Sequence, residues 1–367
     1  MRIGIDAKRI FSNVTGLGVY GRNLVDGLSQ LDSSHQFVLY TPNSSSEHFQ
    51  TSSLTSSFEV HSADKLSSYY WRTFSIKQDI QKDKIDIYHG LSNELPVGIE
   101  KLPIKKIVDI HDLCFVRYKE DYSWLDRQIF WFKTKRAARV CDKIIATSEA
   151  TKKDIIDLLK VPSEKIEVVY QCCDKIFYST YNQQTKTAVK RKYNLPDKYI
   201  LSVGTIQGRK NQKTIVEAIA LLPPKERLPV ILVGNGKKYL KDLLQLAAGL
   251  KVEVQVIPKV KFKDLPCIYQ EAKIFIYPSI VEGFGIPVLE AMASKVPIIT
   301  SRNTSMAEII QNDECLISAN NKEELSKKIQ EFLLGNNEER IHQAYERSSD
   351  FSQEKFAQKL LKIYETI

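Results

Sequence analysis

The sequence lacks several features that would mark other classes of protein. No apolar run approaches the roughly 20 residues that cross a bilayer. The six cysteines include no Cys-x-x-Cys pair, so neither a zinc site nor a disulfide framework is expected. The N-terminal Met1–Asp6 becomes acidic too early for a secretory signal peptide and is typical of a first strand. We therefore expect a cytoplasmic protein with reduced thiols.

The length and the net charge of the chain limit its number of domains and the kinds of ligand that it could bind. The chain has 367 residues, which is too long for one ordinary core and fits two domains. Its 43% hydrophobic content is ordinary for a folded protein. The net charge of +9 is compatible with nucleic acid, an anionic membrane surface or phosphorylated ligands, and it does not choose among them.

Strand and helix patterns alternate along most of the chain. The predicted strands lie at 2–6, 36–40, 85–88, 107–110, 143–147, 199–203, 229–233, 252–257, 274–277 and 296–300. Strands that alternate with helices predict parallel sheets with crossover helices, so the fold class is α/β. The Ser- and Thr-rich stretch 43–57 is predicted to be a polar loop, and the polar stretch 178–190 is interpreted as an interdomain linker.

The segment Glu282–Glu290 reads Glu-Gly-Phe-Gly-Ile-Pro-Val-Leu-Glu and follows the predicted strand at 274–277. Glycines on both sides of the phenylalanine let the backbone approach a ligand, and Pro287 suits the first turn of a helix. The free amides and positive dipole end of such a turn bind anions, while the two carboxylates suit the hydroxyls of a sugar or ribose. Complementing the helix dipole would explain Glu290 alone, but not Glu282 together with both glycines.

A basic motif follows the predicted strand at 199–203. Gly204 begins a turn that leads to Arg209 and Lys210, and Asn211 then stands where a helix N-cap is expected. A glycine turn, two cations and a helix start form a cradle for a diphosphate. Plain surface exposure is the alternative for any Arg-Lys pair, but the position of this pair after a strand favours the cradle.

His111 and Asp112 follow the predicted strand at 107–110. The carboxyl ends of strands are where open α/β sheets place their ligands, which favours a functional role for His111 over a structural one. Two roles are open to Asp112: it orients the imidazole of His111, or it contacts a substrate.

Residues 16–21 match the Gly-x-Gly-x-x-Gly pattern of dinucleotide sites. However, the first glycine comes some ten residues after the first strand, and the second strand ends in Tyr-Thr-Pro without the acid that holds a ribose. We therefore interpret 16–21 as a flexible glycine loop in which Gly18 faces a ligand. Gly16 and Gly21 are equally compatible with a steric need at the helix entry.

Taken together, these motifs resemble one family. A Pro-Ser pair, then Glu-Gly-Phe-Gly-x-Pro-x-x-Glu-Ala-Met-Ala and a further strand, is similar to the donor site of retaining glycosyltransferases of family four, with its mannosyltransferase-like members foremost. The resemblance implies the GT-B architecture of two facing Rossmann-like domains with parallel sheets and an interdomain cleft. It implies an acceptor-side domain at 1–180, with the last helix at 350–367 packing back on it, and a domain at 190–349 that binds the nucleotide-sugar donor.

The resemblance also implies roles for individual residues. Catalytic roles fall on His111, Arg209, Lys210 and Glu282. Donor-binding roles fall on Gly18, Gly204, Val260, Gly283, Phe284, Gly285, Ile286 and Glu290. Within this set Glu282 binds sugar hydroxyls and Glu290 the ribose, while Asp112 contacts the acceptor. The chain departs from the family at Thr205, where some members carry a further arginine, and at Pro258, where glycine is usual; the loop near Val260 therefore does not identify the base.

The expected chemistry is metal-independent and needs no cofactor. The sequence contains no Asp-x-Asp, the pair with which metal-dependent transferases hold a divalent ion, so Arg209 and Lys210 must meet the charge of the departing diphosphate. The resemblance implies hexose transfer with retention by front-side attack, the leaving phosphate accepting the proton of the acceptor. It favours GDP-mannose as donor, with UDP-sugars as the alternative, and a glycan or lipid-linked acceptor.

Three other functions are compatible with parts of the sequence. A nucleotide-sugar epimerase of the same fold would form product without an acceptor. A catalytically silent protein would bind nucleotide sugar without turnover, although His111, Arg209, Lys210 and the paired glutamates argue against it. Binding of nucleic acid rests on net charge alone and is not expected.

The stretch Trp124–Val140 is compatible with a helix and mixes aromatic side chains with cations. Such a helix suits docking on an anionic membrane surface, as a peripheral protein at the inner face, where a lipid-linked acceptor would lie. The alternative places the aromatic side chains in the core and the cations in solvent, which is the commoner arrangement of amphipathic helices.

Overall fold

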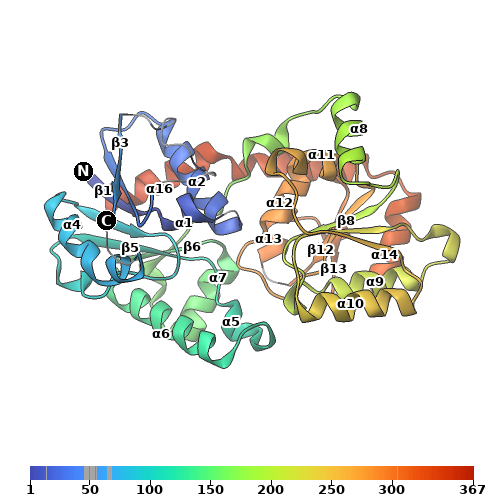
Figure 1. Cartoon of the computed structure of the whole chain (residues 1–367), viewed down its shortest axis with the longest axis horizontal. Coiled ribbons are helices and arrows are strands. Elements are labelled where there is room, and N and C mark those ends of the chain that lie inside the picture. Colours follow the sequence, from blue (N-terminus) through green and yellow to red (C-terminus); the bar gives the residue numbers. More distant parts are fainter. Residues whose placement is uncertain (14, 45–48, 50–53, 55, 64–67, 304) are drawn as a thin grey trace. The chain divides into compact units, whose positions relative to one another are not determined.

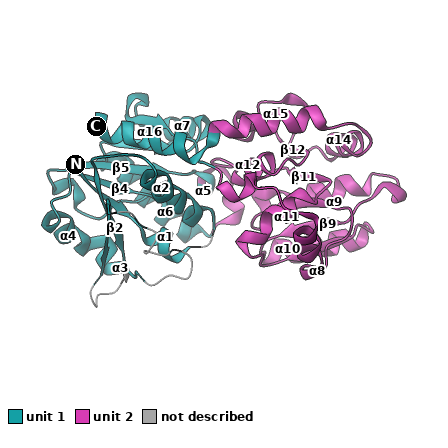
Figure 2. Ribbon diagram, turned by 90° about the horizontal axis from the view of Figure 1, so that it is seen from above, with its two compact units in different colours: residues 1–115, 123–172, 351–367 teal, residues 116–122, 173–350 magenta. Residues whose placement is uncertain are grey.

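A computed structural model describes the chain except for residues 14, 45–48, 50–53, 55, 64–67 and 304 (Figure 1). Most of the polar loop predicted at 43–57 lies outside the described residues. The chain forms two compact units, teal and magenta in Figure 2. Unit 1 contains Met1–Phe115, Ser123–Cys172 and Phe351–Ile367, and unit 2 contains Val116–Tyr122 and Cys173–Asp350.

Unit 1 is built on a parallel seven-stranded sheet in the order β3-β2-β1-β4-β5-β6-β7. The strands are β1 (Arg2–Asp6), β2 (Gln36–Thr41), β3 (Phe58–Ser62), β4 (Ile87–Gly90), β5 (Lys105–Ile110), β6 (Lys143–Ala146) and β7 (Ile166–Val168). The helices include α1 (Lys8–Ser12), α2 (Gly16–Ser29), α3 (Ser68–Tyr70), α4 (Ile76–Lys82), α6 (Trp124–Val140), α7 (Glu149–Asp154) and α16 (Gln353–Thr366); α5 (Cys114–Arg117) runs from unit 1 into unit 2.

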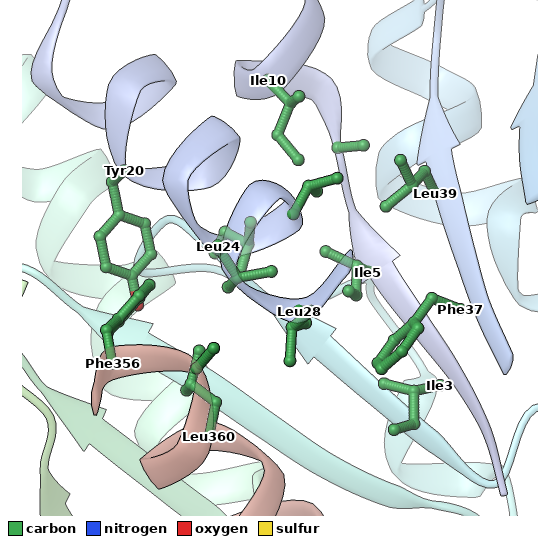
Figure 3. Packing of buried hydrophobic residues seen from close by; sticks show 14 of the residues in the cluster. Ile3, Ile5, Ile10, Tyr20, Leu24, Leu28, Phe37, Leu39, Phe356 and Leu360 are labelled. Atoms are coloured by element: carbon green, nitrogen blue, oxygen red, sulfur yellow. The ribbon is translucent and has the colours of Figure 1, made fainter. Parts of the chain in front are cut away.

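The last helix of the chain packs on the first long helix. The Tyr20 ring of α2 meets the Phe356 ring of α16 edge-on, with centroids 5.3 Å apart, and Leu24, Leu28 and Leu360 are buried in the same core (Figure 3). Gly27 permits this approach, because a Cβ there would lie 2.9 Å from the carbonyl oxygen of Gln353. The two ends of the chain therefore share one hydrophobic core.

The prediction of a flexible glycine loop at 16–21 is wrong, because these residues form the start of α2. A Cβ at Gly18 would lie 1.8 Å from the Asn13 carbonyl oxygen, and a Cβ at Gly21 would lie 2.6 Å from the Ile10 side chain. The two glycines thus let α2 pack closely on the chain that precedes it. This is the steric explanation that the sequence left open for Gly21.

Unit 2 contains a parallel six-stranded sheet in the order β10-β9-β8-β11-β12-β13. The strands are β8 (Ile200–Val203), β9 (Val230–Val233), β10 (Val254–Ile257), β11 (Ile274–Tyr277), β12 (Ile298–Ser301) and β13 (Leu316–Ile317). The helices include α8 (Gln183–Lys192), α9 (Gln212–Ala220), α10 (Lys238–Gly249), α11 (Leu265–Gln270), α12 (Ile286–Ala293), α13 (Ser305–Ile310), α14 (Lys322–Leu334) and α15 (Glu338–Ser348). The predicted α/β class with two parallel sheets is confirmed.

The strand order of each sheet reverses at one place, between β1 and β4 in unit 1 and between β8 and β11 in unit 2. At such a switch point the two crossover connections leave in opposite directions and open a crevice at the carboxyl ends of the strands. Ligands of open α/β sheets bind there, so the ends of β8 and β11 are the expected ligand site of unit 2. No helix in the described part of the chain is long and apolar enough to cross a membrane.

The stretch 178–190, which the sequence predicts to be an interdomain linker, is mostly occupied by α8. Asn182 caps this helix by accepting a hydrogen bond from the Thr185 amide at 2.8 Å, and Val189 is its buried anchor. The compact units divide instead at Cys172–Cys173. These two cysteines, like the other four, are buried and are thiols in the described part of the chain.

Candidate active site

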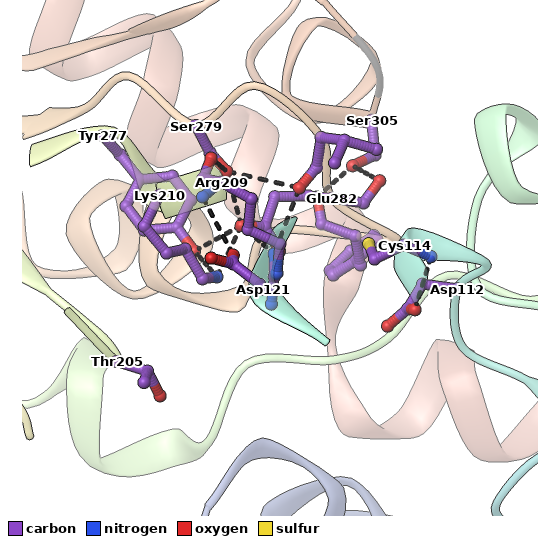
Figure 4. Close-up of polar contacts among 12 residues, drawn as sticks. Asp112, Cys114, Asp121, Thr205, Arg209, Lys210, Tyr277, Ser279, Glu282 and Ser305 are labelled. Atoms are coloured by element: carbon purple, nitrogen blue, oxygen red, sulfur yellow. Dashed lines mark hydrogen bonds and ion pairs between the residues drawn. The ribbon is translucent and has the colours of Figure 1, made fainter. Parts of the chain in front are cut away.

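Glu282 follows β11 at the switch point of unit 2, and a cluster of polar side chains surrounds it (Figure 4). Arg209 and Lys210 form ion pairs with its Oε1 atom at 2.7 and 2.5 Å. Ser279 and Tyr277 donate hydrogen bonds to the same oxygen at 2.7 and 3.1 Å, and Lys210 also donates to the Tyr277 hydroxyl. All the side-chain contacts described for this carboxylate therefore converge on Oε1.

The negative charge of Glu282 is stable despite its burial. Burial alone raises the pKa of the carboxyl, but the charges of Arg209 and Lys210, helped by hydrogen bonds from Lys210 and Ser279, lower the pKa to about 2. Glu282 is therefore ionised at neutral pH, and these three residues together carry one negative and two positive charges. The excess of positive charge suits an anionic ligand such as a diphosphate.

Arg209 and Lys210 lie on η8 (Gly208–Lys210), a short 3-10 turn after β8. The loop after β11 fixes this turn, because the Ile280 amide donates to the Arg209 carbonyl oxygen at 2.8 Å. The backbones of the two loops that carry the charged cluster are thus hydrogen-bonded to each other.

Two residues shape the chain around η8. Gly204 leaves β8 with φ 134°, a conformation that strongly favours glycine. Asn211 stands at the predicted N-cap position of α9 with a left-handed φ of 58°. Its side-chain amide donates to the Ala319 carbonyl oxygen at 2.6 Å, so it ties the helix start to the loop after β13 rather than capping the helix.

The glycine loop connects Glu282 directly to α12. Gly285 is the N-cap residue with φ 109°, so α12 begins at Ile286 and Pro287 occupies its second position. Phe284 is buried, and the Ser305 hydroxyl donates to its carbonyl oxygen at 2.5 Å. The backbone of the loop is therefore fixed, and the first amides of α12 follow within a few residues of Glu282.

Glu290 lies within α12 and has different partners from Glu282. The Tyr269 hydroxyl donates a hydrogen bond to its Oε2 atom at 2.7 Å. Burial raises the pKa of Glu290 to about 8, the hydrogen bond from Tyr269 opposing the shift and the charge of Asp174 adding to it. In the absence of ligand this carboxyl is thus mostly protonated at neutral pH.

In unit 1, His111 follows β5 and both of its ring nitrogens have partners. Nε2 lies 2.8 Å from the Leu91 carbonyl oxygen, which only accepts, so Nε2 carries the proton. Gln171 then donates to Nδ1 at 3.3 Å, and the Tyr20 ring packs edge-on at a centroid distance of 4.7 Å. These contacts fix the orientation of the imidazole in a buried position.

Asp112 does not orient this imidazole, since Leu91 and Gln171 do so. Its Oδ1 atom accepts a hydrogen bond from the Cys114 amide at 2.9 Å at the start of α5. Asn93 holds the backbone of both residues, accepting from the His111 amide at 3.0 Å and donating to the Asp112 carbonyl oxygen at 3.1 Å.

The structure brings some of the predicted site residues into contact and leaves others apart. In unit 2, Arg209, Lys210 and Glu282 form one cluster joined to the loop 283–286. Val260 is half-buried in the loop after β10, and among the described contacts none connects it with that cluster. In the described part of the chain no group of three or more His, Cys, Asp or Glu side chains is arranged to hold a metal ion.

The sequence did not predict three residues that contact Glu282 or Glu290. Tyr277 and Ser279 contact Glu282 and could have been found, because they lie at the end of the strand that precedes the glycine loop. Tyr269 contacts Glu290 from α11, and its position in the sequence gives no indication of this contact.

Comparisons with known proteins agree with this architecture. Residues 14–175 match the family model described as Glycosyltransferase Family 4, and residues 183–349 match the model described as Glycosyl transferases group 1. Among curated relatives, O-antigen chain mannosyltransferase B of Escherichia coli is 30% identical over 253 residues, which cover 67% of this chain and 65% of the relative. O-antigen chain mannosyltransferase RfbU of Salmonella typhimurium is 30% identical over 207 residues, which cover 56% and 54%. The chain thus spans somewhat less than two thirds of the length of these relatives.

Solved structures resemble the chain over its whole length. A sucrose-phosphate synthase from Thermosynechococcus elongatus has a TM-score of 0.80 at 18% identity, covering 100% of this chain and 98% of that one. WaaG, a glycosyltransferase involved in lipopolysaccharide biosynthesis, has a TM-score of 0.72 at 16% identity, covering 99% of each chain. At such identities the similarity concerns the fold. The two family models together account for most of the chain and confirm the resemblance found in its motifs. The chain belongs to the family-four glycosyltransferases of the GT-B fold.

Proposed function

We propose that this chain transfers mannose from GDP-mannose to a growing glycan, with retention of configuration at the anomeric carbon. The observation that carries the proposal is the Glu282 cluster, an ionised carboxylate paired with Arg209 and Lys210 at the switch point of unit 2. Diphosphate and sugar hydroxyls are the two ligand groups that such a cluster suits.

In this proposal the two cations bind the diphosphate and stabilise its charge as the bond to the sugar breaks, so no metal is assigned a role. The contacts of Glu282 go to Oε1, and we therefore assign its Oε2 atom to the sugar hydroxyls. Glu290 accepts hydrogen bonds from the ribose. The acceptor hydroxyl attacks the anomeric carbon from the side on which the diphosphate leaves, and its proton passes to the leaving phosphate.

The other assigned roles follow the family resemblance. His111 contacts the donor sugar beside the reacting carbon, and its ring is held in a fixed orientation there. Asp112 contacts the acceptor. Backbone contacts to the donor come from Gly18, Gly204, Val260 and the loop Gly283–Ile286.

The donor and acceptor are chosen by analogy with the relatives whose names specify mannose and O-antigen chains. Thermal unfolding with GDP, UDP and ADP in parallel tests the base, since a ligand that binds only the folded state raises its stability with the logarithm of concentration over Kd. Stabilisation by UDP and not by GDP would replace GDP-mannose with a UDP-sugar.

Transfer itself is tested by incubating the chain with GDP-mannose and a mannose-terminated oligosaccharide, and by determining the anomeric configuration of the product by NMR. An inverted product contradicts the mechanism. Product formed without acceptor indicates an epimerase, and nucleotide binding without turnover indicates a silent binding protein. Full turnover by Lys210→Ala contradicts the role of the cation cluster.

We further propose that α6 docks on an anionic membrane surface at the cytoplasmic face, which brings the chain to a lipid-linked acceptor. Trp124 and Phe132 are each 70% exposed, and Arg127, Lys133 and Lys135 lie on the same helix. Exposed aromatic side chains beside cations suit the headgroup region of anionic lipids. Sedimentation with phosphatidylglycerol vesicles should pull down the chain but not Trp124→Ala/Phe132→Ala, and equal recovery of both would contradict docking.

A further inference from the structure

Residues Val116–Tyr122 come from the N-terminal half of the sequence but lie in unit 2. The segment begins within α5 and includes the short turn η4 (Lys119–Asp121). It leaves unit 1 after Phe115 and returns to it at Ser123. A short excursion of this kind needs specific contacts in unit 2 to fix its position there.

The carboxylate of Asp121 supplies two such contacts. Its Oδ1 atom accepts a hydrogen bond from the Gly208 amide and its Oδ2 atom accepts one from the Arg209 amide, both at 3.0 Å (Figure 4). These are the first two amides of η8, and Gln207, the N-cap residue of the turn, provides no side-chain cap. Asp121 therefore caps η8 from a distant part of the sequence.

Gly208 leaves room for this contact. A Cβ at Gly208 would lie 2.7 Å from the Tyr118 hydroxyl oxygen and 2.9 Å from the Asp121 Oδ1 atom. Any larger residue would therefore push the segment away from η8. Glycine is needed at this position for space, because its backbone does not adopt a left-handed conformation.

The contact fixes the peptide that carries one of the two cations. The Arg209 amide is held by Asp121, and the Arg209 carbonyl oxygen is held by the Ile280 amide. Because both backbone groups of Arg209 have partners, the backbone of η8 is fixed. The side chains of Arg209 and Lys210 therefore leave it in a defined direction, toward Glu282. A charged acceptor on two neighbouring amides makes a strong restraint of this kind.

We propose that Asp121 is a positioning residue for the donor site, which acts through the backbone of η8 to hold Arg209 and Lys210 in place for the diphosphate of the donor. The inference rests on the proposed function, because it assumes that these two cations bind the donor. It differs from an autoinhibitory role, in which an acidic side chain close to two cations would compete with an anionic ligand. The two roles predict opposite changes in affinity when the carboxylate is removed.

The test measures binding of GDP and guanosine, with UDP and uridine in parallel, by titration calorimetry on the full chain. Asp121→Ala should weaken diphosphate binding about tenfold and leave nucleoside binding unchanged, since loss of hydrogen bonds to a charged group has this magnitude. Asp121→Asn keeps one acceptor oxygen and should lose roughly threefold. Gly208→Ala should act in the same direction as Asp121→Ala.

Glu120→Ala is the matched control, because Glu120 is an exposed acid one residue away in the same segment, and it should bind GDP like the wild type. Unchanged or tighter binding of GDP by Asp121→Ala overturns the inference, as does equal loss of GDP and guanosine. If the wild type binds a nucleoside diphosphate but transfers no sugar, the proposed function is wrong, whereas the role of Asp121 in diphosphate binding is not contradicted. A wild type that binds neither nucleotide would remove both.

Discussion

Glu282 and Glu290 belong to one motif and both carboxyl groups are buried, yet their pKa values move in opposite directions. Burial raises the pKa at both positions. At Glu282 two cations outweigh burial and lower the pKa to about 2, whereas at Glu290 burial prevails and raises it to about 8. The partners of a buried carboxyl, rather than its depth, decide whether it is charged.

The difference assigns the two glutamates to different stages of binding. Glu282 and its cations hold their charges before any ligand arrives, which is the preorganisation that electrostatic stabilisation of a leaving group needs. Glu290 is protonated at neutral pH and must lose its proton before both oxygens can accept ribose hydroxyls. Substitution of Glu282, of its partner Lys210 or of Glu290 tests this difference between the two carboxyl groups.

Glu282→Ala should have the largest effect, because it leaves the partly buried Arg209 and the buried Lys210 beside each other without a counter-charge. We expect transfer to fall about 1000-fold, from loss of a preorganised group, and the unfolding free energy to fall by about 3 kcal/mol. Turnover and urea denaturation measure the two effects. Glu314→Ala is the control, since Glu314 also pairs with an arginine but is 63% exposed, and it should change stability by less than about 1 kcal/mol. Wild-type turnover by Glu282→Ala would contradict the assignment.

Lys210→Met would make Glu282 resemble Glu290, because it removes one cation while keeping an unbranched side chain. The pKa of Glu282 should rise, so the acid limb of the kcat/KM profile should move to higher pH. Transfer should fall roughly 100-fold. Lys213→Met, at a half-exposed lysine three residues along, should leave the profile unchanged. An unshifted acid limb in Lys210→Met would show that the lysine does not control the charge of Glu282.

Much of this arrangement could be predicted from local patterns. The strand at 274–277 and the helix at 124–140 lie at the predicted bounds, because these segments have clear ends. Arg209, Lys210 and Glu282 could be predicted to meet because each follows a strand next to the switch point. The polar composition of 178–190 instead hid α8, whose inward-facing residues give little apolar pattern beyond Val189.

The contacts that set the charge and position of these groups could not be predicted in the same way. Tyr269 and Asp121 reach their partners from segments far away in the sequence, and such pairs depend on tertiary packing that leaves no local pattern. The sequence places Glu282 and Glu290 in one motif, whereas the structure gives each its own partners. The roles of His111 and Asp112 in transfer stay predictions.

Glu290→Gln tests whether the ribose ionises Glu290. With a pKa of about 8, the wild-type carboxyl should release about one proton when it binds a nucleotide at pH 7, provided that its ionised form accepts the ribose hydroxyls. The binding enthalpy should then differ between phosphate and Tris buffers by the difference in their ionisation enthalpies. The glutamine variant should show no such difference. Equal wild-type enthalpies in both buffers would mean that Glu290 stays protonated in the complex.

The smallest expected effect is on stability without ligand, and its sign follows from the same pKa. Between the ordinary value of 4.5 and about 8, the folded chain keeps a proton on Glu290 that the unfolded chain has released. The contribution of Glu290 to stability therefore falls as pH rises through this range and is constant above it. Glu290→Gln removes that loss, so its apparent Tm should match the wild type near pH 5 and exceed it by about 3 °C at pH 8. A Tm difference that is the same at both pH values would show that Glu290 is ionised in the ligand-free protein, and the contrast with Glu282 would then be lost.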